Sequence, residues 1–316
     1  MEQMRKTVHK TQFPGRRKQR GLGLVEIMIA MLLVVFMFNG LMEIFLSSRQ
    51  TYTATDNLTR LQETGRASID ILVSGLRRSG YLGGNSDISF IEGSLGPFPA
   101  RTNCPKANNK WGRMISQSVF GKDDTRGGYG CIDDTYLRGD ILTVRYASQW
   151  EVDTADMVAT RMYLRSSLFE GKLFLGSDQA NTINTVYDTP QRQHEWQAFS
   201  YYVANTTRTC NGAPVPALYR ERLNAVNRPV SEELIAGVEN IQFQYNIGNR
   251  YVNASNGLDW NSVISVKVWV LVRAECPETG YVDNGTYVMG NVSPDYTPND
   301  SYRRQLYSTV VALRNL

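Results

Sequence analysis

The residues best placed to do chemistry lie where a basic leader meets an apolar segment. Gly21 ends the leader, Leu22 begins the apolar run, and Glu26 is the acid that interrupts the start of that run. A carboxylate in a lipid-facing helix is costly and needs a partner. Cleavage after Gly21 would expose a cationic amine on Leu22, one helical turn from Glu26. If the chain is cut there, Leu22 and Glu26 can therefore form an ion pair, within one chain or with a neighbouring subunit.

Positive charge is concentrated in the leader. Residues 1–21 contain seven Lys or Arg and one acid, a net +6, whereas the whole chain carries +4, so the remainder carries −2. Positive charge beside an apolar segment keeps that flank in the cytoplasm. A nucleic-acid-binding arm is the alternative interpretation of a basic run. Because this run directly adjoins an apolar segment, we expect a membrane anchor and no direct nucleic-acid site.

The pattern after the junction predicts one long helix, from Leu22 to about Arg78. Residues 22–46 are apolar enough and long enough to span a bilayer. An ordinary secretory signal would place its cleavage site after the apolar core, whereas Gly21 lies before it. Residues 47–80 are amphipathic, and glycines at 80, 83 and 84 end the helix. Their apolar residues recur at steps of three and four: Leu58, Leu61, Gly65, Ile69, Leu72 and Leu76.

Residues 81–316 are expected to form a β-rich globular domain, with a loop-rich region at 81–135. No alternation of strands with helices is present, so the sheet should be mainly antiparallel and the fold class α+β. The strongest strand is 262–273. Its face of five branched residues should be buried: Ile264, Val266, Val268, Val270 and Val272. The other expected strands are 140–147, 158–165, 172–175, 198–204, 217–222, 239–245 and 306–313. A loop containing Cys210, Pro214 and Pro216 should join 198–204 to 217–222 as a hairpin.

Four cysteines follow the anchor, without C-x-x-C spacing. With two histidines in the chain, zinc binding is not expected, and we predict no metal site and no cofactor. In an oxidising compartment the cysteines would form disulfides. Of the three possible pairings we favour Cys104–Cys131 and Cys210–Cys276, with buried free thiols as the alternative.

No enzymatic motif is present. The sequence contains no G-x-S-x-G, H-E-x-x-H or phosphate-binding loop, and His194 has no nucleophile that a motif would assign to it. Asp123-Asp124 and Asp133-Asp134 lack the spacing of a calcium-binding EF-hand loop, which favours a solvated loop. The sequence therefore predicts a structural or binding protein and no catalytic residues.

The junction resembles the signal of type IV prepilins, in which a peptidase cuts after the glycine, the new amine is N-methylated, and a glutamate at mature position five supports assembly. Glu26 is the fifth residue from Leu22. Later segments resemble PilW-type minor pilins. These segments are Arg77–Tyr81, Glu232–Tyr245, Val263–Arg273 and Tyr302–Asn315.

The resemblance implies a type IV pilin-like fold and a minor pilin that primes or caps a type IV pilus. Its expected place is the bacterial inner membrane, with the N-terminus cytoplasmic and residues 81–316 periplasmic, and later the pilus fibre or tip. Implied functions are pilus assembly, twitching motility, adhesion or DNA uptake. Implied partners are other minor pilins, the major pilin, prepilin peptidase, the assembly platform and, as a further candidate, a tip adhesin. A J-type pseudopilin of type II secretion and an anchored periplasmic binding domain remain alternatives.

Overall fold

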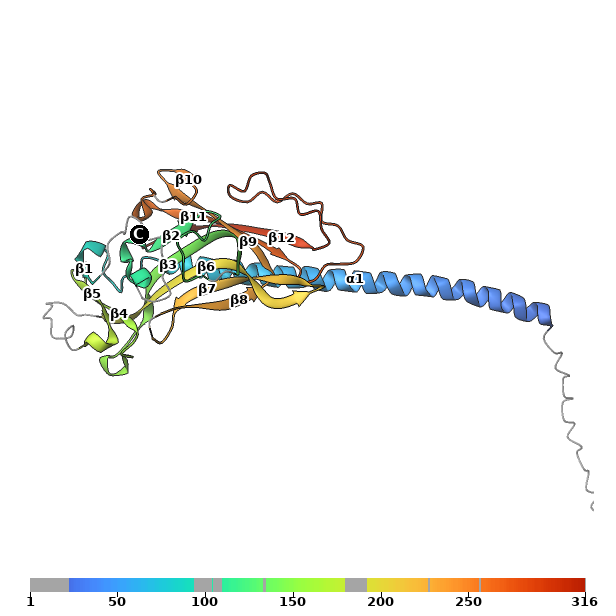
Figure 1. Cartoon of the computed structure of the whole chain (residues 1–316), viewed down its shortest axis with the longest axis horizontal. Coiled ribbons are helices and arrows are strands. Elements are labelled where there is room, and N and C mark those ends of the chain that lie inside the picture. The colour runs from blue at the N-terminus through green and yellow to red at the C-terminus, as the bar shows by residue number, and fades with distance from the viewer. Residues whose placement is uncertain are drawn as a thin grey trace, which may run out of the picture. The chain divides into compact units, whose positions relative to one another are not determined.

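A computed structural model describes residues 23–93, 104, 110–132, 135–179, 192–226, 228–255 and 257–315. The chain divides into two compact units, Met1–Thr53 and Ala54–Leu316. Helix α1 (Leu24–Arg78) begins in the first unit and ends in the second. Figure 1 shows the helices and strands with their labels.

Within the first unit, the described residues form the apolar part of α1. A window of this helix has a mean hydropathy of 2.4, and by length and composition α1 is the one candidate membrane span among the described residues. Every residue from 24 to 46 is exposed in the single chain. An exposed helix that is apolar on all sides requires lipid or other apolar helices around it.

Within the second unit, the rest of α1 packs on strands through one face. Leu61, Leu72 and Leu76 are buried in the main core, as the three-and-four spacing predicts. Two glycines on this face allow close approach: Gly65 lies against Tyr307 of β12, and Gly75 lies against Tyr201 of β6. The helix ends at Arg78, and Gly80, with φ of 75°, follows in the left-handed conformation that stops a helix.

The second unit contains two sheets. The larger has eight strands in the order β1-β5-β4-β6-β3-β2, with β7 added beside β6 and β8 beside β7. Its strands are β1 (Ile91–Glu92), β2 (Val119–Lys122), β3 (Tyr136–Glu151), β4 (Met162–Ser166), β5 (Gly171–Leu175), β6 (Arg192–Cys210), β7 (Ala213–Leu223) and β8 (Pro229–Ala236). All its pairs are antiparallel except β1 with β5.

The smaller sheet is antiparallel, in the order β10-β9-β11-β12. Its strands are β9 (Val238–Ile247), β10 (Arg250–Val252), β11 (Ser265–Arg273) and β12 (Arg304–Ala312). Val268 of β11 lies opposite Phe243 of β9 and Thr309 of β12. The short 3-10 helices are η1 (Ile88–Phe90), η2 (Lys110–Arg113), η3 (Ile115–Gln117), η4 (Thr154–Asp156), η5 (Gly176–Asp178) and η6 (Trp260–Ser262).

One main core joins both sheets to the second part of α1, which confirms the α+β fold class. Val144 of β3, Phe199 of β6, Phe243 of β9 and Val268 of β11 all belong to it. The four valines of the predicted core face of β11 are buried, but Ile264, the fifth residue of that face, precedes the strand and is 53% exposed. Part of the opposite face is buried too: Trp269 and Leu271 form a separate small cluster with Met289, which lies in the segment between β11 and β12. This segment therefore covers Trp269 and Leu271, whereas Ser265 and Lys267 on the same face are half-buried.

The predicted hairpin is correct, but its predicted loop is wrong. Strands β6 and β7 continue through Cys210 and from Ala213, so the turn is only residues 211–212. Pro214 lies opposite Thr209 and Pro216 opposite Asn205, with a register shift between these pairs. This part of β7 does not pair with β8, whose ladder begins at Ala217. An unpaired edge tolerates proline because no amide hydrogen is needed there.

The predicted strand 158–165 is also shorter than expected. β4 begins at Met162, because residues 158–161 form a turn in which the Arg161 amide donates to the Val158 carbonyl. The Val158 amide in turn donates to the hydroxyl of Tyr163. Strand β8 was not predicted, and its mostly half-buried residues give no clear two-residue alternation.

Gly65 offers a test of the packing of α1 on the smaller sheet. A Cβ at this position would lie 2.1 Å from the ring of Tyr307, far inside van der Waals contact. We expect Gly65→Val to lower the free energy of unfolding by about 1–3 kcal/mol, as overpacked cores do. Urea unfolding of the full-length chain in detergent would measure this. Gly257→Val, where nothing lies within 4 Å of the added Cβ, is the control, and equal effects of the two substitutions would contradict the proposed close contact.

Candidate functional site

Glu26, the predicted assembly residue, caps the first turn of α1. Gly23 precedes the helix, and its carbonyl accepts hydrogen bonds from the amides of Glu26 and Ile27. The Glu26 side chain reaches back, and its Oε2 accepts a hydrogen bond of 3.0 Å from the Gly23 amide. This is half of a capping box, with the acid at the third helical position. Gly21 and Leu22, the predicted processing residues, lie outside the described residues.

The Glu26 carboxylate retains capacity for a cation. It is exposed, and among the described residues no ion pair involves it. The capping bond occupies one oxygen with a neutral donor, so the negative charge remains uncompensated. A carboxylate at the positive end of a helix dipole is favourable, and an ammonium group near it would be more so. The geometry therefore suits an ion pair with an amine at the helix start.

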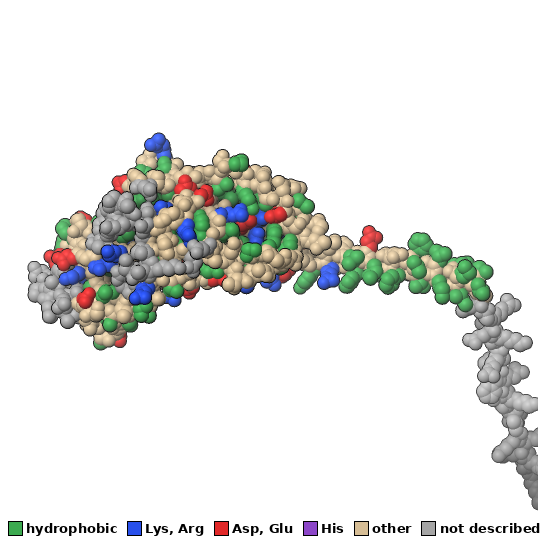
Figure 2. Space-filling model, in the orientation of Figure 1, with side chains coloured by type: hydrophobic (Ala, Val, Ile, Leu, Met, Phe, Trp, Pro, Cys, Tyr) green, Lys and Arg blue, Asp and Glu red, His purple; other side chains and the backbone are tan. Residues whose placement is uncertain are grey.

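The surface that follows Glu26 is apolar. Figure 2 shows hydrophobic side chains gathered along this part of α1. Phe36, Met37 and Phe38 are each at least 60% exposed in the single chain. Glu43 is a second acid in the same helix, seventeen positions further on, and it is exposed as well. This surface can associate with lipid or with similar helices.

The structure forms both disulfides in the pairing that the sequence analysis favoured. Cys104 is joined to Cys131 across 27 residues, and both are buried in the main core. Cys210 is joined to Cys276 across 66 residues. The second bond links the end of β6, in the larger sheet, to the segment after β11, in the smaller sheet. Closing loops of these lengths typically stabilises a fold by a few kcal/mol.

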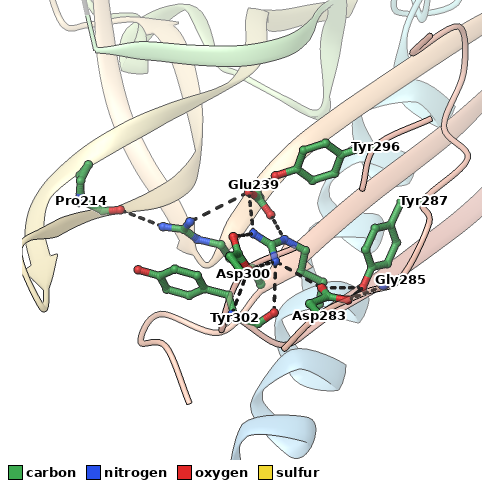
Figure 3. A network of polar contacts seen from close by, with 10 residues as sticks. Pro214, Glu239, Asp283, Gly285, Tyr287, Tyr296, Asp300 and Tyr302 are labelled. Atoms are coloured by element: carbon green, nitrogen blue, oxygen red, sulfur yellow. Dashed lines mark hydrogen bonds and ion pairs between the residues drawn. The ribbon is translucent and has the colours of Figure 1, made fainter. Parts of the chain in front are cut away.

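A buried ionic network on the smaller sheet was not predicted. Arg304, at the start of β12, has a side chain that is 0% exposed and is surrounded by three carboxylates (Figure 3). It forms ion pairs with Glu239 of β9 and with Asp283 and Asp300, both in the segment between β11 and β12. The two bonds to Asp300 measure 2.6 and 2.7 Å. The network therefore ties this segment to the sheet.

Tyrosines and a second arginine complete the network (Figure 3). Tyr296 donates to Glu239 at 3.0 Å, and Tyr287 donates to Asp283 at 3.0 Å. Arg273 Nη1 lies 4.0 Å from Glu239 and donates from Nη2 to the carbonyl of Pro214. Burial alone would lower the pKa of Arg304, but its hydrogen bonds to Asp300 and Glu239 outweigh burial and raise it. Arg304 is thus held in its charged form.

Sequence reasoning missed this network, although it had quoted the two residues at its centre. Glu239 and Arg304 occur in two of the segments that resemble PilW-type pilins, and they are 65 positions apart. The available signal was an acid at the start of the predicted strand 239–245 and a base two residues before the predicted strand 306–313. Only the antiparallel order β9-β11-β12 brings those strand ends together.

His194 is packed inside the larger sheet. Its Nδ1 lies 3.2 Å from the Trp150 carbonyl, and its ring makes an edge contact with Tyr81. The nearby hydroxyl of Ser166 donates to the Gly83 carbonyl. The serine proton is therefore directed to the backbone and not to the imidazole.

A long N-terminal helix that is apolar in its first part and packed on an antiparallel sheet in its second defines a type IV pilin-like architecture. Comparison with known families agrees: the family model PilW, described as type IV pilus-assembly protein W, matches residues 200–315. Residues 200–315 are therefore similar to type IV pilus-assembly protein W, which confirms the resemblance in the C-terminal part of the chain.

A solved type IV-like pilin, TTHA1219 from Thermus thermophilus, is similar to 56% of this chain and 79% of its own, at 15% identity and a TM-score of 0.31. No curated protein matches the chain.

Proposed function

We propose that this protein is a minor pilin of a type IV pilus, cut after Gly21 and incorporated through the apolar part of α1. The observation that carries the proposal is the coincidence of a PilW-type region at 200–315 with an exposed apolar helix that begins beside Glu26. A soluble domain would bury such a helix, and a simple anchor has no need of an acid in its first turn.

The proposed mechanism begins in the inner membrane, with the leader in the cytoplasm and the β-rich domain in the periplasm. Removal of residues 1–21 discards the basic excess and leaves the amine of Leu22, methylated, at the helix start. Glu26 then neutralises such an amine, on its own chain or on a neighbour in the filament. The domain 81–316 contacts other minor pilins and the major pilin, and the assembled complex primes or caps the fibre. Twitching motility, adhesion or DNA uptake would follow from the pilus it supports.

The first test is the mass of the mature chain. In cells that build pili, the protein purified from membranes and from sheared fibres should begin at Leu22 and carry one additional methyl group. Gly21→Val should retain the leader, because a branched side chain replaces the smallest residue at the scissile bond. Gly15→Val, a matched change within the leader, should be processed normally.

Intact-protein mass spectrometry distinguishes these outcomes directly. A chain from fibres that still begins at Met1 would contradict the proposal. So would efficient processing of Gly21→Val at the same bond. Either result would favour an anchored periplasmic domain that does not enter a fibre.

A further inference from the structure

The structure gathers three carboxylates at the edge where β2, β3 and β9 meet. Asp123 and Asp124 directly follow β2, and Asp140 lies in β3, which pairs with β2. One oxygen from each lies within 4.8 Å of the others. Among the described residues, none of the three forms an ion pair. Three adjacent negative charges with no cation repel one another, and the repulsion is strongest where water is excluded.

Asp140 is held at a fixed position in this cluster. It is 1% exposed, its Oδ1 accepts the Asp124 amide at 3.0 Å, and its Oδ2 accepts the Phe243 amide at 2.7 Å. Each carboxylate oxygen has a second lone pair, so these bonds leave acceptor capacity on both oxygens. Asp140 therefore connects the 123–124 turn to β9 and can still bind a cation.

Two carboxamides face the acids, and both leave an oxygen without a donor. Gln242 of β9 is 0% exposed; its Nε2 donates to Asp124 at 2.9 Å and to Asn240 at 3.2 Å, and its Oε1 has no partner. Asn291 donates from Nδ2 to both oxygens of Asp123, at 3.0 and 3.1 Å, and its Oδ1 has no partner. A buried amide oxygen without a donor is costly. The Gln242 oxygen in particular is an unsatisfied buried acceptor on a side chain that already contacts the cluster.

The orientation of a carboxamide is set by one terminal side-chain torsion, so reversing it requires no movement of the backbone. A rotation of 180° exchanges the oxygen and the nitrogen of a carboxamide. In the cation-free arrangement the N–H groups face the carboxylates and partly compensate their charge. With a cation among the carboxylates, the two oxygens would face it instead. The cluster would then offer five side-chain oxygens from four segments of the chain.

We propose that Asp123, Asp124 and Asp140, together with the side-chain oxygens of Gln242 and Asn291, bind one calcium ion. Calcium takes six to eight oxygen ligands at 2.3–2.6 Å in irregular geometry, so two of its ligands lie at most about 5 Å apart. One oxygen from each of the three carboxylates meets this limit. Magnesium requires shorter bonds and near-ideal octahedral geometry, and the set contains none of the nitrogen or sulfur ligands that favour zinc. The site does not depend on the proposed role in the pilus.

The ion would fasten the segment between β11 and β12 to the larger sheet. Asn291 belongs to that segment, whereas Asp123 and Asp140 belong to the β2–β3 region. Calcium should therefore raise the melting temperature as well as bind. The proposal therefore has two readouts, the calcium affinity and the melting temperature. The affinity reports directly on the ligands.

The test uses the full-length chain in detergent, stripped of metal with EDTA and titrated calorimetrically with calcium chloride. We expect one site with a Kd of about 10⁻⁵ to 10⁻³ M and an increase in melting temperature. Asp124→Asn should weaken binding at least tenfold, and asparagine suits the positive φ of 43° at this position. Asp123→Asn should behave in the same way. Asp156→Asn, which changes an exposed acid on η4, should bind like the wild type.

Three results would overturn the proposal. The first is no calcium-dependent heat or melting shift in the wild type up to about 10 mM, which needs no variant to fold. The second is unchanged binding in both asparagine variants, which would place calcium elsewhere. The third is an affinity for magnesium equal to that for calcium, because the proposed site should be selective for calcium.

Discussion

Replacing Arg304 with methionine will lower the free energy of unfolding by about 3–5 kcal/mol, because it leaves buried carboxylates without a counter-charge. Glu239 and Asp283 are 2% and 3% exposed, and both pair with Arg304. Methionine retains an unbranched apolar stem but not the guanidinium group, so part of the effect will come from lost volume. Urea unfolding of the full-length chain in detergent, followed by tryptophan fluorescence, would measure the change.

Two comparisons separate the charge from the loss of volume. Arg60→Met removes an exposed pair with Asp56, and it should change stability by less than about 1 kcal/mol. Adding Glu239→Gln and Asp283→Asn to Arg304→Met removes the unpaired charges and should recover part of the stability. If Arg304→Met is as mild as Arg60→Met, the network contributes no more than a surface ion pair and our interpretation is wrong.

The network also predicts how stability responds to acid. The hydrogen bond from Arg304 lowers the pKa of Asp300, and the hydrogen bond from Arg303 lowers the pKa of Glu278. A carboxyl whose pKa is lowered by folding stabilises the protein above its unfolded-state pKa, and this contribution is lost as pH falls through the folded value. The wild type should therefore lose stability on acidification, and Arg304→Met should lose less because Asp300 no longer has its partner.

The parts of the fold that follow from local pattern were predictable from the sequence. The spacing of Leu61, Leu72 and Leu76 fixed the buried face of α1, and the run of valines fixed the core face of β11. These signals depend on residues three or four apart in a helix and two apart in a strand. The helix end after Arg78 was also a local signal, because Gly80 readily adopts the left-handed conformation that stops a helix.

The parts that depend on distant contacts were not predictable. Trp269 and Leu271 were assigned to the outer face of β11, but the returning segment with Met289 covers them. Pro214 and Pro216 were assigned to a loop, but they lie in a stretch of β7 that pairs with β6 and not with β8, and only the sheet order reveals this edge position. The carboxylate cluster was not predictable for the same reason. Asp124 and Asp140 are 16 positions apart, and only the register of β2 on β3 brings them together.

The second large effect concerns assembly. Glu26→Ala should be cleaved after Gly21 as the wild type is, yet enter fibres at least tenfold less efficiently. Removal of the carboxylate would leave a neighbouring amine unpaired in the apolar filament core, and an uncompensated buried charge costs about 3 kcal/mol or more, roughly a hundredfold in equilibrium. The amount of variant in sheared fibres relative to the membrane pool, measured by immunoblotting, tests this. Glu43→Ala, the other acid in this part of α1, is the control and should assemble nearly normally.

The structure supplies a sharper variant, because Glu26 has two separable properties. Its Oε2 caps Gly23, and its charge is available to an amine. Glu26→Gln retains an oxygen that can accept the Gly23 amide but carries no charge. If helix capping were the essential property, Gln would assemble and Ala would not, since loss of the cap alone costs about 1 kcal/mol. If pairing with an amine is essential, Gln and Ala will fail to the same extent. Normal incorporation of Glu26→Gln would thus contradict the ion-pair mechanism, even with processing intact, and would reduce Glu26 to a residue that begins a helix.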